Sequence, residues 1–456
     1  MVHLHNSATG QIEELKPIEA GTVSMYVCGP TVYDVPHIGH GRFVLVFDIL
    51  RRYLEHRGLS VVHVSNITDV DDKILARAAS EGREPLEVSR QFEDLWWETL
   101  RSLNVLRPTH TPHATAYISK MLSFIGELVE ADAAYLAGDG VYFEVSKVSD
   151  YGLLAHQSLD SLRAGARVEA NPNKRSQLDF ALWKLTPDDR WAWDSSFGRG
   201  RPGWHTECVV MSEDLLGKTF DIHGGGADLM FPHHENERAQ ARALGHRFAH
   251  LWVHNGFVAV NDVKMSKSLH NYVTLPDLVG SSDPRAYRLL VLQAHYRSPL
   301  EVNVALIADA ARALGRIDSA LERYWATPAA GGLVLGEPTV MEAFHGAMDD
   351  DLDTPAAVSL LFQTVTRMNS AMDRNDEVAS ALGAAVAAIT SALGLQNEKR
   401  DVAIPAAVAD LFRKREAARA GRDFALSDAL RKNLEELGWI IEDGREGGVL
   451  RYRGRQ

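Results

Sequence analysis

Cysteine is nearly absent from this sequence: only Cys28 and Cys208 occur among its 456 residues. So few cysteines cannot form the disulfide framework of a secreted protein, and we expect a cytoplasmic one. No apolar run is long enough to cross a bilayer, so the sequence predicts no contact with a membrane. The first residues are polar, and we expect no cleavable signal peptide in them.

Basic residues are fewer than acidic ones, and the formal net charge is −13. This balance argues against a surface that binds nucleic acid everywhere, but an RNA partner needs only a local basic patch. Hydrophobic residues make up 45% of the chain and charged residues 24%, as in an ordinary soluble protein of several domains.

The string His-Ile-Gly-His occupies residues 37–40. It follows a predicted strand at 23–27 and leads into a predicted helix at 42–56. Such a turn holds phosphates against backbone amides and the positive end of a helix dipole. Gly39 leaves room for a nucleotide base beside the backbone, while His37 and His40 offer hydrogen bonds to an α-phosphate. We interpret this turn as an ATP site.

A second string, Lys-Met-Ser-Lys-Ser, occupies residues 264–268 in a polar segment. Lys264 and Lys267 would place compact positive charge on a leaving pyrophosphate, with Lys267 also binding ATP. Either string alone fits a solvated lysine loop or two histidines in a turn. Together, in this order, they favour a carboxylate activated by ATP, which Mg²⁺ would accompany.

Strands and helices alternate in the first part of the chain, where we expect strands at 219–223 and 251–260 and a glycine-rich turn at 224–226. The later part is helical, with a helix expected at 301–324. This order predicts an α/β fold: a doubly wound parallel-sheet (Rossmann-like) catalytic domain with an insertion, followed by an α-helical bundle and a small α+β C-terminal module. The expected parts are 1–114 and 200–260 for the halves of the catalytic domain, 115–199 for the insertion, 261–300 for the region that carries the lysine string, 301–395 for the bundle and 396–456 for the module.

Four residues distant along the chain form a candidate zinc set: Cys28, Cys208, His233 and Glu237. Two sulfurs, an imidazole and a carboxylate suit zinc better than magnesium. The same residues also fit two buried core cysteines, a helix-capping histidine and an exposed glutamate, so the residues alone leave both interpretations open. A metalloprotease helix is excluded, because its histidines flank a five-residue window and those here do not.

Taken together, these residues resemble cysteinyl-tRNA synthetase, a family of class I aminoacyl-tRNA synthetases. The resemblance covers nearly the whole chain and rests on the strings at 25–34, 37–40, 66–69, 71–73, 200–208, 220–226, 228–237, 264–268 and 349–355. It is weakest in the insertion and the terminal module. His270 departs from the family, which usually has glycine at that position.

The resemblance implies an activity, cysteine–tRNA ligase, and roles for individual residues. It implies that the four residues above hold one Zn²⁺, which binds the sulfur of substrate L-cysteine. It places Trp204 in the cysteine pocket, with Thr68 and Asp228 near the amino group. It assigns ATP to the two strings and the anticodon of tRNA(Cys) to the terminal parts. We expect a monomer.

Three other functions compete with this one. A paralogous ligase activates cysteine in the same way but passes it to an amino sugar; it needs no anticodon reader. A non-catalytic, zinc-containing RNA-binding relative would not need the two strings. A nucleotidyltransferase would need neither the zinc set nor the long helical tail.

The terminal module carries many basic residues near Trp439, which favours RNA, although a solvated helix surface also fits them. These are Arg413, Lys414, Arg415, Arg419, Arg422, Arg431, Lys432, Arg451, Arg453 and Arg455.

Overall fold

The computed structural model describes residues 1–157, 171–186, 191–260, 263–264, 273–327, 336–397, 406–421, 423–437, 439–444 and 447–452. The chain divides into two compact units, Met1–Leu395 and Gln396–Gln456. Among the described helices, none is both long and apolar enough to span a membrane.

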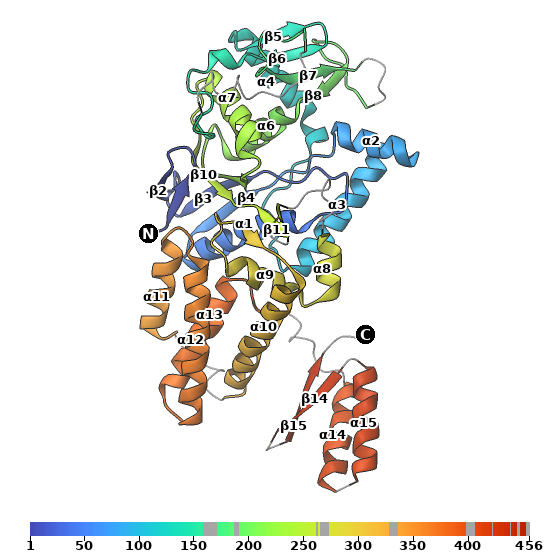
Figure 1. The fold of residues 1–456 in the computed structure, drawn as a ribbon, viewed down its shortest axis with the longest axis vertical. Coiled ribbons are helices and arrows are strands. Elements are labelled where there is room, and N and C mark those ends of the chain that lie inside the picture. The colour runs from blue at the N-terminus through green and yellow to red at the C-terminus, as the bar shows by residue number, and fades with distance from the viewer. Residues whose placement is uncertain are drawn as a thin grey trace. The chain divides into compact units, whose positions relative to one another are not determined.

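A four-stranded parallel sheet lies at the centre of the larger unit, in the order β10–β9–β3–β4 (Figure 1). Its strands are β3 (Thr22–Val27), β4 (Ser60–Val64), β9 (Thr219–Gly226) and β10 (Phe248–Asn255). Helix α1 (Ile38–His56) connects β3 to β4, and α7 (Glu235–Ala243) connects β9 to β10. The chain therefore winds away in opposite directions from the neighbouring strands β3 and β9. Their shared carboxyl end is the switch point where such folds bind ligands, and the predicted fold class is confirmed.

Two predicted element boundaries near this sheet differ from those in the structure. Helix α1 begins at Ile38 and not at residue 42, because His37 and His40 cap it. The turn expected at 224–226 is wrong: strand β9 continues through Gly226. A Cβ atom on Gly224 would lie 2.3 Å from Phe47, and one on Gly225 would lie 2.7 Å from His234. These glycines serve close packing rather than a change of chain direction.

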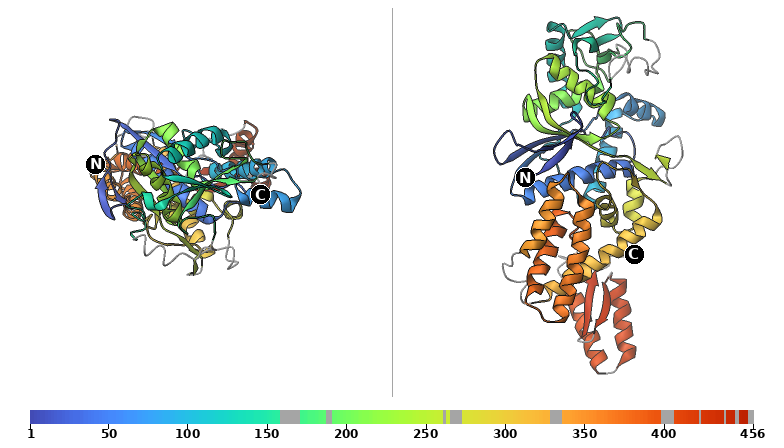
Figure 2. Two further views of the ribbon diagram at one scale, coloured as in Figure 1. Left: turned by 90° about the horizontal axis from the view of Figure 1, so that it is seen from above. Right: turned by 60° about the vertical axis from the view of Figure 1, so that its left-hand side comes forward.

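The insertion begins with α4 (Ile118–Glu130) and forms an antiparallel sheet in the order β5–β6–β7–β8. Its strands are β5 (Ala134–Ala137), β6 (Gly140–Phe143), β7 (Phe180–Leu185) and β8 (Gly200–Pro202). Strand β8 leads into α6 (Trp204–Leu216), which returns the chain to the central sheet. Figure 2 shows the insertion and helices α10–α13 on opposite sides of that sheet.

Short elements complete the catalytic region. Strands β1 (His3–Asn6) and β2 (Gln11–Glu14) form an antiparallel hairpin. Helix α2 (Asp72–Glu81) is followed by α3 (Pro85–Ser102), which the sequence did not predict although its buried face includes Phe92 and Trp96. Single helical turns lie at Ala114–Tyr117, Val145–Lys147 and Met230–His234.

The strand expected at 251–260 is wrong, because it is broken at Gly256. The amide of Gly256 donates a 2.8 Å hydrogen bond to the carbonyl of Tyr296, which turns the chain away from β10. A second, three-stranded sheet follows in the order β12–β11–β13. Its strands are β11 (Val258–Val260), β12 (Val263–Lys264) and β13 (Leu300–Glu301).

Helices alone make up the rest of the larger unit. They are α8 (Leu275–Ser281), α9 (Pro284–Leu292), α10 (Val304–Trp325), α11 (Pro338–Asp349), α12 (Thr354–Asp373) and α13 (Val378–Ala392). The side chains of Asp283, Asn303 and Asp353 each accept a hydrogen bond from a backbone amide in the first turn of the helix that follows. Helix α10 therefore starts after Asn303, whereas the sequence predicted a start at Glu301, which pairs in β13.

The smaller unit contains α14 (Ala406–Ala420), α15 (Phe424–Glu436) and a hairpin of β14 (Trp439–Gly444) and β15 (Gly447–Tyr452). Its small core joins Val408, Leu434 and Trp439. Trp439 is only 4% exposed, so its ring packs in this core and gives no support to RNA binding.

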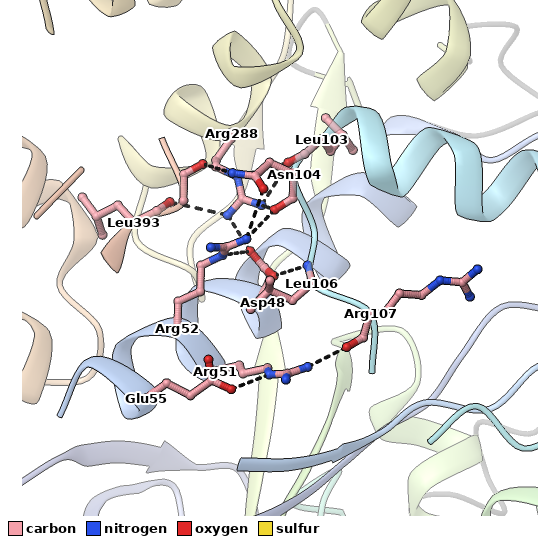
Figure 3. A network of polar contacts seen from close by, with 11 residues as sticks. Asp48, Arg51, Arg52, Glu55, Leu103, Asn104, Leu106, Arg107, Arg288 and Leu393 are labelled. Carbon is pink, nitrogen blue, oxygen red and sulfur yellow. Dashed lines mark hydrogen bonds and ion pairs between the residues drawn. The ribbon is translucent and has the colours of Figure 1, made fainter. Parts of the chain in front are cut away.

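A buried ion network joins α1 to the helical region (Figure 3). Asp48 accepts hydrogen bonds from Arg52 Nε at 2.8 Å and Arg288 Nη1 at 2.6 Å. It also accepts one from the amide of Leu106 at 2.8 Å. Burial alone would raise the pKa of Asp48, but Arg288 and Arg52 hold it below its ordinary value. The carboxylate is therefore ionised at neutral pH and paired with two guanidinium groups.

Candidate metal centre and active site

Four buried side chains converge at the switch point of the central sheet. Cys28 directly follows β3, Cys208 lies on α6, His233 lies in the single turn before α7, and Glu237 lies on α7. The two sulfurs are 3.7 Å apart, and Cys208 Sγ is 3.6 Å from His233 Nε2. Glu237 Oε1 lies 3.0 Å from His233 Nε2 and 3.4 Å from Cys28 Sγ. These are the four residues of the predicted zinc set.

Their spacing and chemistry fit a tetrahedral zinc ion. All four ligand atoms lie within 4.8 Å of one another. Bond lengths of about 2.3 Å to sulfur and 2.0–2.2 Å to nitrogen or oxygen imply about 3.8 Å between two sulfurs and about 3.4 Å between nitrogen and oxygen. The observed separations are close to these values. Thiolate and imidazole donors also favour zinc over magnesium or calcium.

Two ligands of the cluster, Glu237 and Cys208, are shifted toward their ionised forms. Burial alone would raise the pKa of Glu237, but His223 and His233 bring it well below its ordinary range. Burial also acts against ionisation of Cys208, yet the hydrogen bond from Cys28 and the proximity of His233 lower its pKa to about 6. The other two ligands are shifted toward their protonated forms: burial raises the pKa of Cys28 well above its ordinary value, and Glu237 outweighs burial and raises the pKa of His233 to about 10. A divalent cation would have to displace these two protons.

Histidines that the sequence analysis missed surround the cluster. His223 Nε2 lies 2.7 Å from Glu237 Oε2, and His205 Nδ1 lies 2.9 Å from His233 Nδ1. A second candidate metal set combines His223 and His234 with Cys28 and Glu237. A histidine within a buried strand, as His223 is in β9, was the available signal. Such partners orient metal ligands.

The predicted cysteine-binding residues lie in different surroundings. Thr68 is buried; it accepts a hydrogen bond from Asn66 Nδ2 at 3.1 Å and donates one to Glu207 at 2.8 Å. Trp204 is 38% exposed and stacks on His233, with the ring centres 3.9 Å apart. Asp228 is exposed. Thr68 and Trp204 therefore flank the four candidate zinc ligands.

Glu207 and Asn66 were missed as pocket residues. Burial raises the pKa of Glu207 well above its ordinary value. The side chain of Asn66 accepts a 2.7 Å hydrogen bond from the amide of Gly29, directly after Cys28. A Cβ atom on Gly29 would lie 1.6 Å from the carbonyl oxygen of Asn66, so only glycine fits there. The chain segments after β3 and β4 are thus held together beside the cluster.

The His37–His40 turn forms the first turn of α1 through a reciprocal cap. The amide of His40 donates to Nδ1 of His37, and the amide of His37 donates to Nδ1 of His40, each at 3.2 Å. The two rings stack with their centres 3.7 Å apart. Because each Nδ1 accepts, the proton of each neutral ring resides on Nε2. Both rings therefore carry a hydrogen-bond donor, at the helix end that favours anions. Gly39 is partly exposed in the same turn.

Arg42 connects this turn to the strand before the lysine string. It is 1% exposed and donates to backbone carbonyls of Phe257 at 2.5 Å, of Tyr296 at 3.1 Å and of Ser298. The backbone of Lys264 pairs with Ala259 of β11. Lys267 and His270 lie outside the described residues.

Known protein families and curated proteins are similar to this chain over most of its length. The family model described as tRNA synthetases class I (C) catalytic domain matches residues 14–312, and the DALR domain matches 343–397. Cysteine–tRNA ligase of Alkalilimnicola ehrlichii is 44% identical over 99% of this chain and 100% of its own length. This chain belongs to the cysteine–tRNA ligase family. That of Caldicellulosiruptor saccharolyticus is 42% identical over 97% of this chain and 98% of its own.

Other class I synthetases share the fold of this cysteine–tRNA ligase family member. The methionyl-tRNA synthetase of Mycobacterium tuberculosis, solved with methionyl-adenylate, matches with a TM-score of 0.61. The match covers 82% of this chain and 89% of that one, at 14% identity. The family relatives match the terminal module as well, which favours a tRNA ligase over the amino-sugar ligase.

Proposed function

We propose that this chain attaches L-cysteine to tRNA(Cys) in two steps. The cysteine carboxylate attacks the α-phosphate of ATP, giving cysteinyl-adenylate and pyrophosphate. A ribose hydroxyl at the 3′ end of the tRNA then attacks the adenylate and releases AMP. One observation carries the proposal: Cys28, Cys208, His233 and Glu237 converge at the switch point of the central sheet. The proposed ATP turn follows strand β3 of the same sheet.

These four residues would hold Zn²⁺. When bound, zinc supplies a soft Lewis acid that prefers a thiolate to the harder, less acidic hydroxyl of serine. A pocket that works by shape alone discriminates poorly, because one methylene is worth about 10- to 200-fold. The difference in size between serine and cysteine is smaller than one methylene group. The ligand set therefore explains selectivity without an editing site.

The remaining pocket residues position the amino acid. Trp204 stacks on His233 and covers one side of the cluster. Thr68 is held by Asn66 and Glu207, so its hydroxyl has a fixed place near the substrate amino group. Asp228 would supply negative charge for the same ammonium group. This arrangement holds the carboxylate toward the ATP turn.

The residues of the two strings stabilise charge on ATP. His37 and His40 would donate from Nε2 to the α-phosphate, and Gly39 would leave room for the base. Lys264 and Lys267 would bind pyrophosphate, with Mg²⁺ accompanying ATP. No side chain needs to form a covalent intermediate, because positioning and charge stabilisation suffice.

The helical bundle and the terminal module would bind the tRNA, in a cytoplasmic monomer. In the module, Arg413 and Lys414 pair with Asp410, whereas Arg415 is buried beside Glu416. Basic side chains that remain accessible would contact phosphates. Deleting residues after Gln396 should weaken tRNA charging far more than adenylate formation. Equal loss of both would show that the module is needed only for folding.

Exchange of radioactive pyrophosphate into ATP tests the first step. We expect exchange that depends on cysteine and not on serine. His40→Asn should lower its kcat about 100-fold, since a donor to the reacting phosphate is lost. His110→Asn is the matched control, because His110 is exposed and lies outside the site. Exchange no faster with cysteine than without it would refute the proposal.

A further inference from the structure

The larger unit ends in three successive carbonyl groups that are each bound by a different side chain. Arg288 Nη1 donates to the carbonyl of Leu393 at 3.4 Å, and Asn104 Nδ2 donates to that of Gly394 at 3.1 Å. Arg285 Nη1 donates to the carbonyl of Leu395 at 3.1 Å. We call these three side chains and three carbonyls the carbonyl clasp. It lies at the residue where the two compact units divide.

The local backbone explains why these carbonyls accept from side chains. Helix α13 ends at Ala392, and the last carbonyls of a helix have no amide of a next turn to accept from. Gly394 adopts a φ of +68°, and the amide of Leu395 turns back to the carbonyl of Thr390 at 2.9 Å. A Cβ atom on Gly394 would lie 2.5 Å from Arg288 Nη1. Glycine thus permits both the turn and the close approach of the guanidinium.

The donors of the carbonyl clasp are themselves fixed. Arg288 is fully buried and bound to Asp48 of α1 at 2.6 Å, as Figure 3 shows. Arg285 is bound to Asp283 at 2.7 Å and to Asp318 at 2.8 Å. Asn104 accepts a 3.4 Å hydrogen bond from Arg52 through its side-chain oxygen. The carbonyl clasp is therefore tied to α1, the helix whose first turn is the proposed ATP site.

The position of the carbonyl clasp matters because the tRNA must bind both the active site and the terminal module. The tRNA has to present its 3′ end to the active site while another part contacts the terminal module. Once one part is bound, the other binds at an effective concentration that the connecting chain sets. A connection that is fixed at its root restricts the module more than one that is loose, and it costs less entropy to order on binding.

We propose that Asn104, with Arg285 and Arg288, is a positioning residue for tRNA: the carbonyl clasp fixes the root of the chain that leads to the module. This inference rests on the proposed function, in which the module binds tRNA. Asn104 then acts in the tRNA-dependent step and not in adenylate formation, because it does not contact the reacting atoms.

Asn104→Gly in the full-length chain tests this role. Asn104 has a φ of +55°, which glycine adopts without strain, so the substitution removes the side-chain bonds and keeps the backbone. Asn375→Gly is the matched control, because Asn375 has a φ of +52° and is exposed. Both variants are assayed for cysteine-dependent pyrophosphate exchange and for charging of tRNA(Cys).

For Asn104→Gly we expect the KM for tRNA to rise about fivefold, the factor that one hydrogen bond typically contributes, with exchange within twofold of the control. Unchanged charging would overturn the inference. So would equal losses in exchange and charging, because they would mean general damage to the fold. If the unsubstituted chain charges no tRNA at all, the proposed function fails, and not this inference alone.

Discussion

Thr68 donates a 2.8 Å hydrogen bond from its hydroxyl to Glu207, and both side chains are buried beside the metal cluster. Glu207 precedes Cys208 on α6, whereas Thr68 follows β4. The bond therefore joins the two segments that carry the proposed cysteine pocket. The Thr68 hydroxyl also accepts a hydrogen bond from Asn66, so one hydroxyl group bonds to residues on two sides of the pocket.

Thr68→Val keeps the shape of the side chain and removes this hydroxyl. We expect the KM for cysteine in pyrophosphate exchange to rise about tenfold, since a buried partner loses its bond, while the KM for ATP stays within twofold. Thr364→Val is the control: Thr364 is buried, and its hydroxyl donates to the carbonyl of Leu360 in its own helix. Equal KM values for cysteine in the two variants would contradict this role.

Asp48→Asn should destabilise the larger unit. The substitution keeps the volume but leaves Arg52 and Arg288 without their buried counter-charge. Removing one partner of such a network costs about 3–5 kcal/mol of unfolding free energy. Urea unfolding followed by circular dichroism measures this, with the exposed Asp94→Asn as the control. A difference below about 1 kcal/mol would show that the network contributes little.

His63 should make the protein sensitive to acid. Its ring nitrogens have no hydrogen-bond partner among the described residues, and burial lowers its pKa to about 3. Below pH 6.5 the unfolded chain binds a proton at this residue that the folded chain does not, so stability falls as pH falls. The loss is about 1.4 kcal/mol per pH unit, or about 2 kcal/mol at pH 5.

His63→Phe removes this proton site and places an apolar ring among Phe47, Trp97 and Val27. Between pH 7.5 and pH 5, the unmodified chain should lose about 2 kcal/mol more unfolding free energy than the variant. Urea unfolding at both pH values gives the comparison. Parallel losses would assign the acid sensitivity to other groups.

Periodicity and turn residues predicted most of the fold, and the misses have local causes. The parallel sheet followed from alternating strands and helices. The start of α1 did not, because histidine is not among the residues preferred at a helix N-cap. Gly224 and Gly225 looked like a turn, since nothing in the sequence shows that Phe47 and His234 occupy the space beside them.

The candidate site shows a similar division. Cys28, Cys208, His233 and Glu237 were chosen from their chemistry and the family resemblance, and the structure brings them together. Glu207 was not chosen, because its role depends on burial and on Thr68, which lies far from it in the sequence. Distances between segments that meet only in the folded state are not encoded in local patterns.

Elemental analysis of the purified chain tests the central claim most directly. We predict one zinc ion per chain, and loss of that zinc in Cys208→Ser together with loss of the preference for cysteine over serine in pyrophosphate exchange. A chain that contains no zinc and still prefers cysteine would contradict the account.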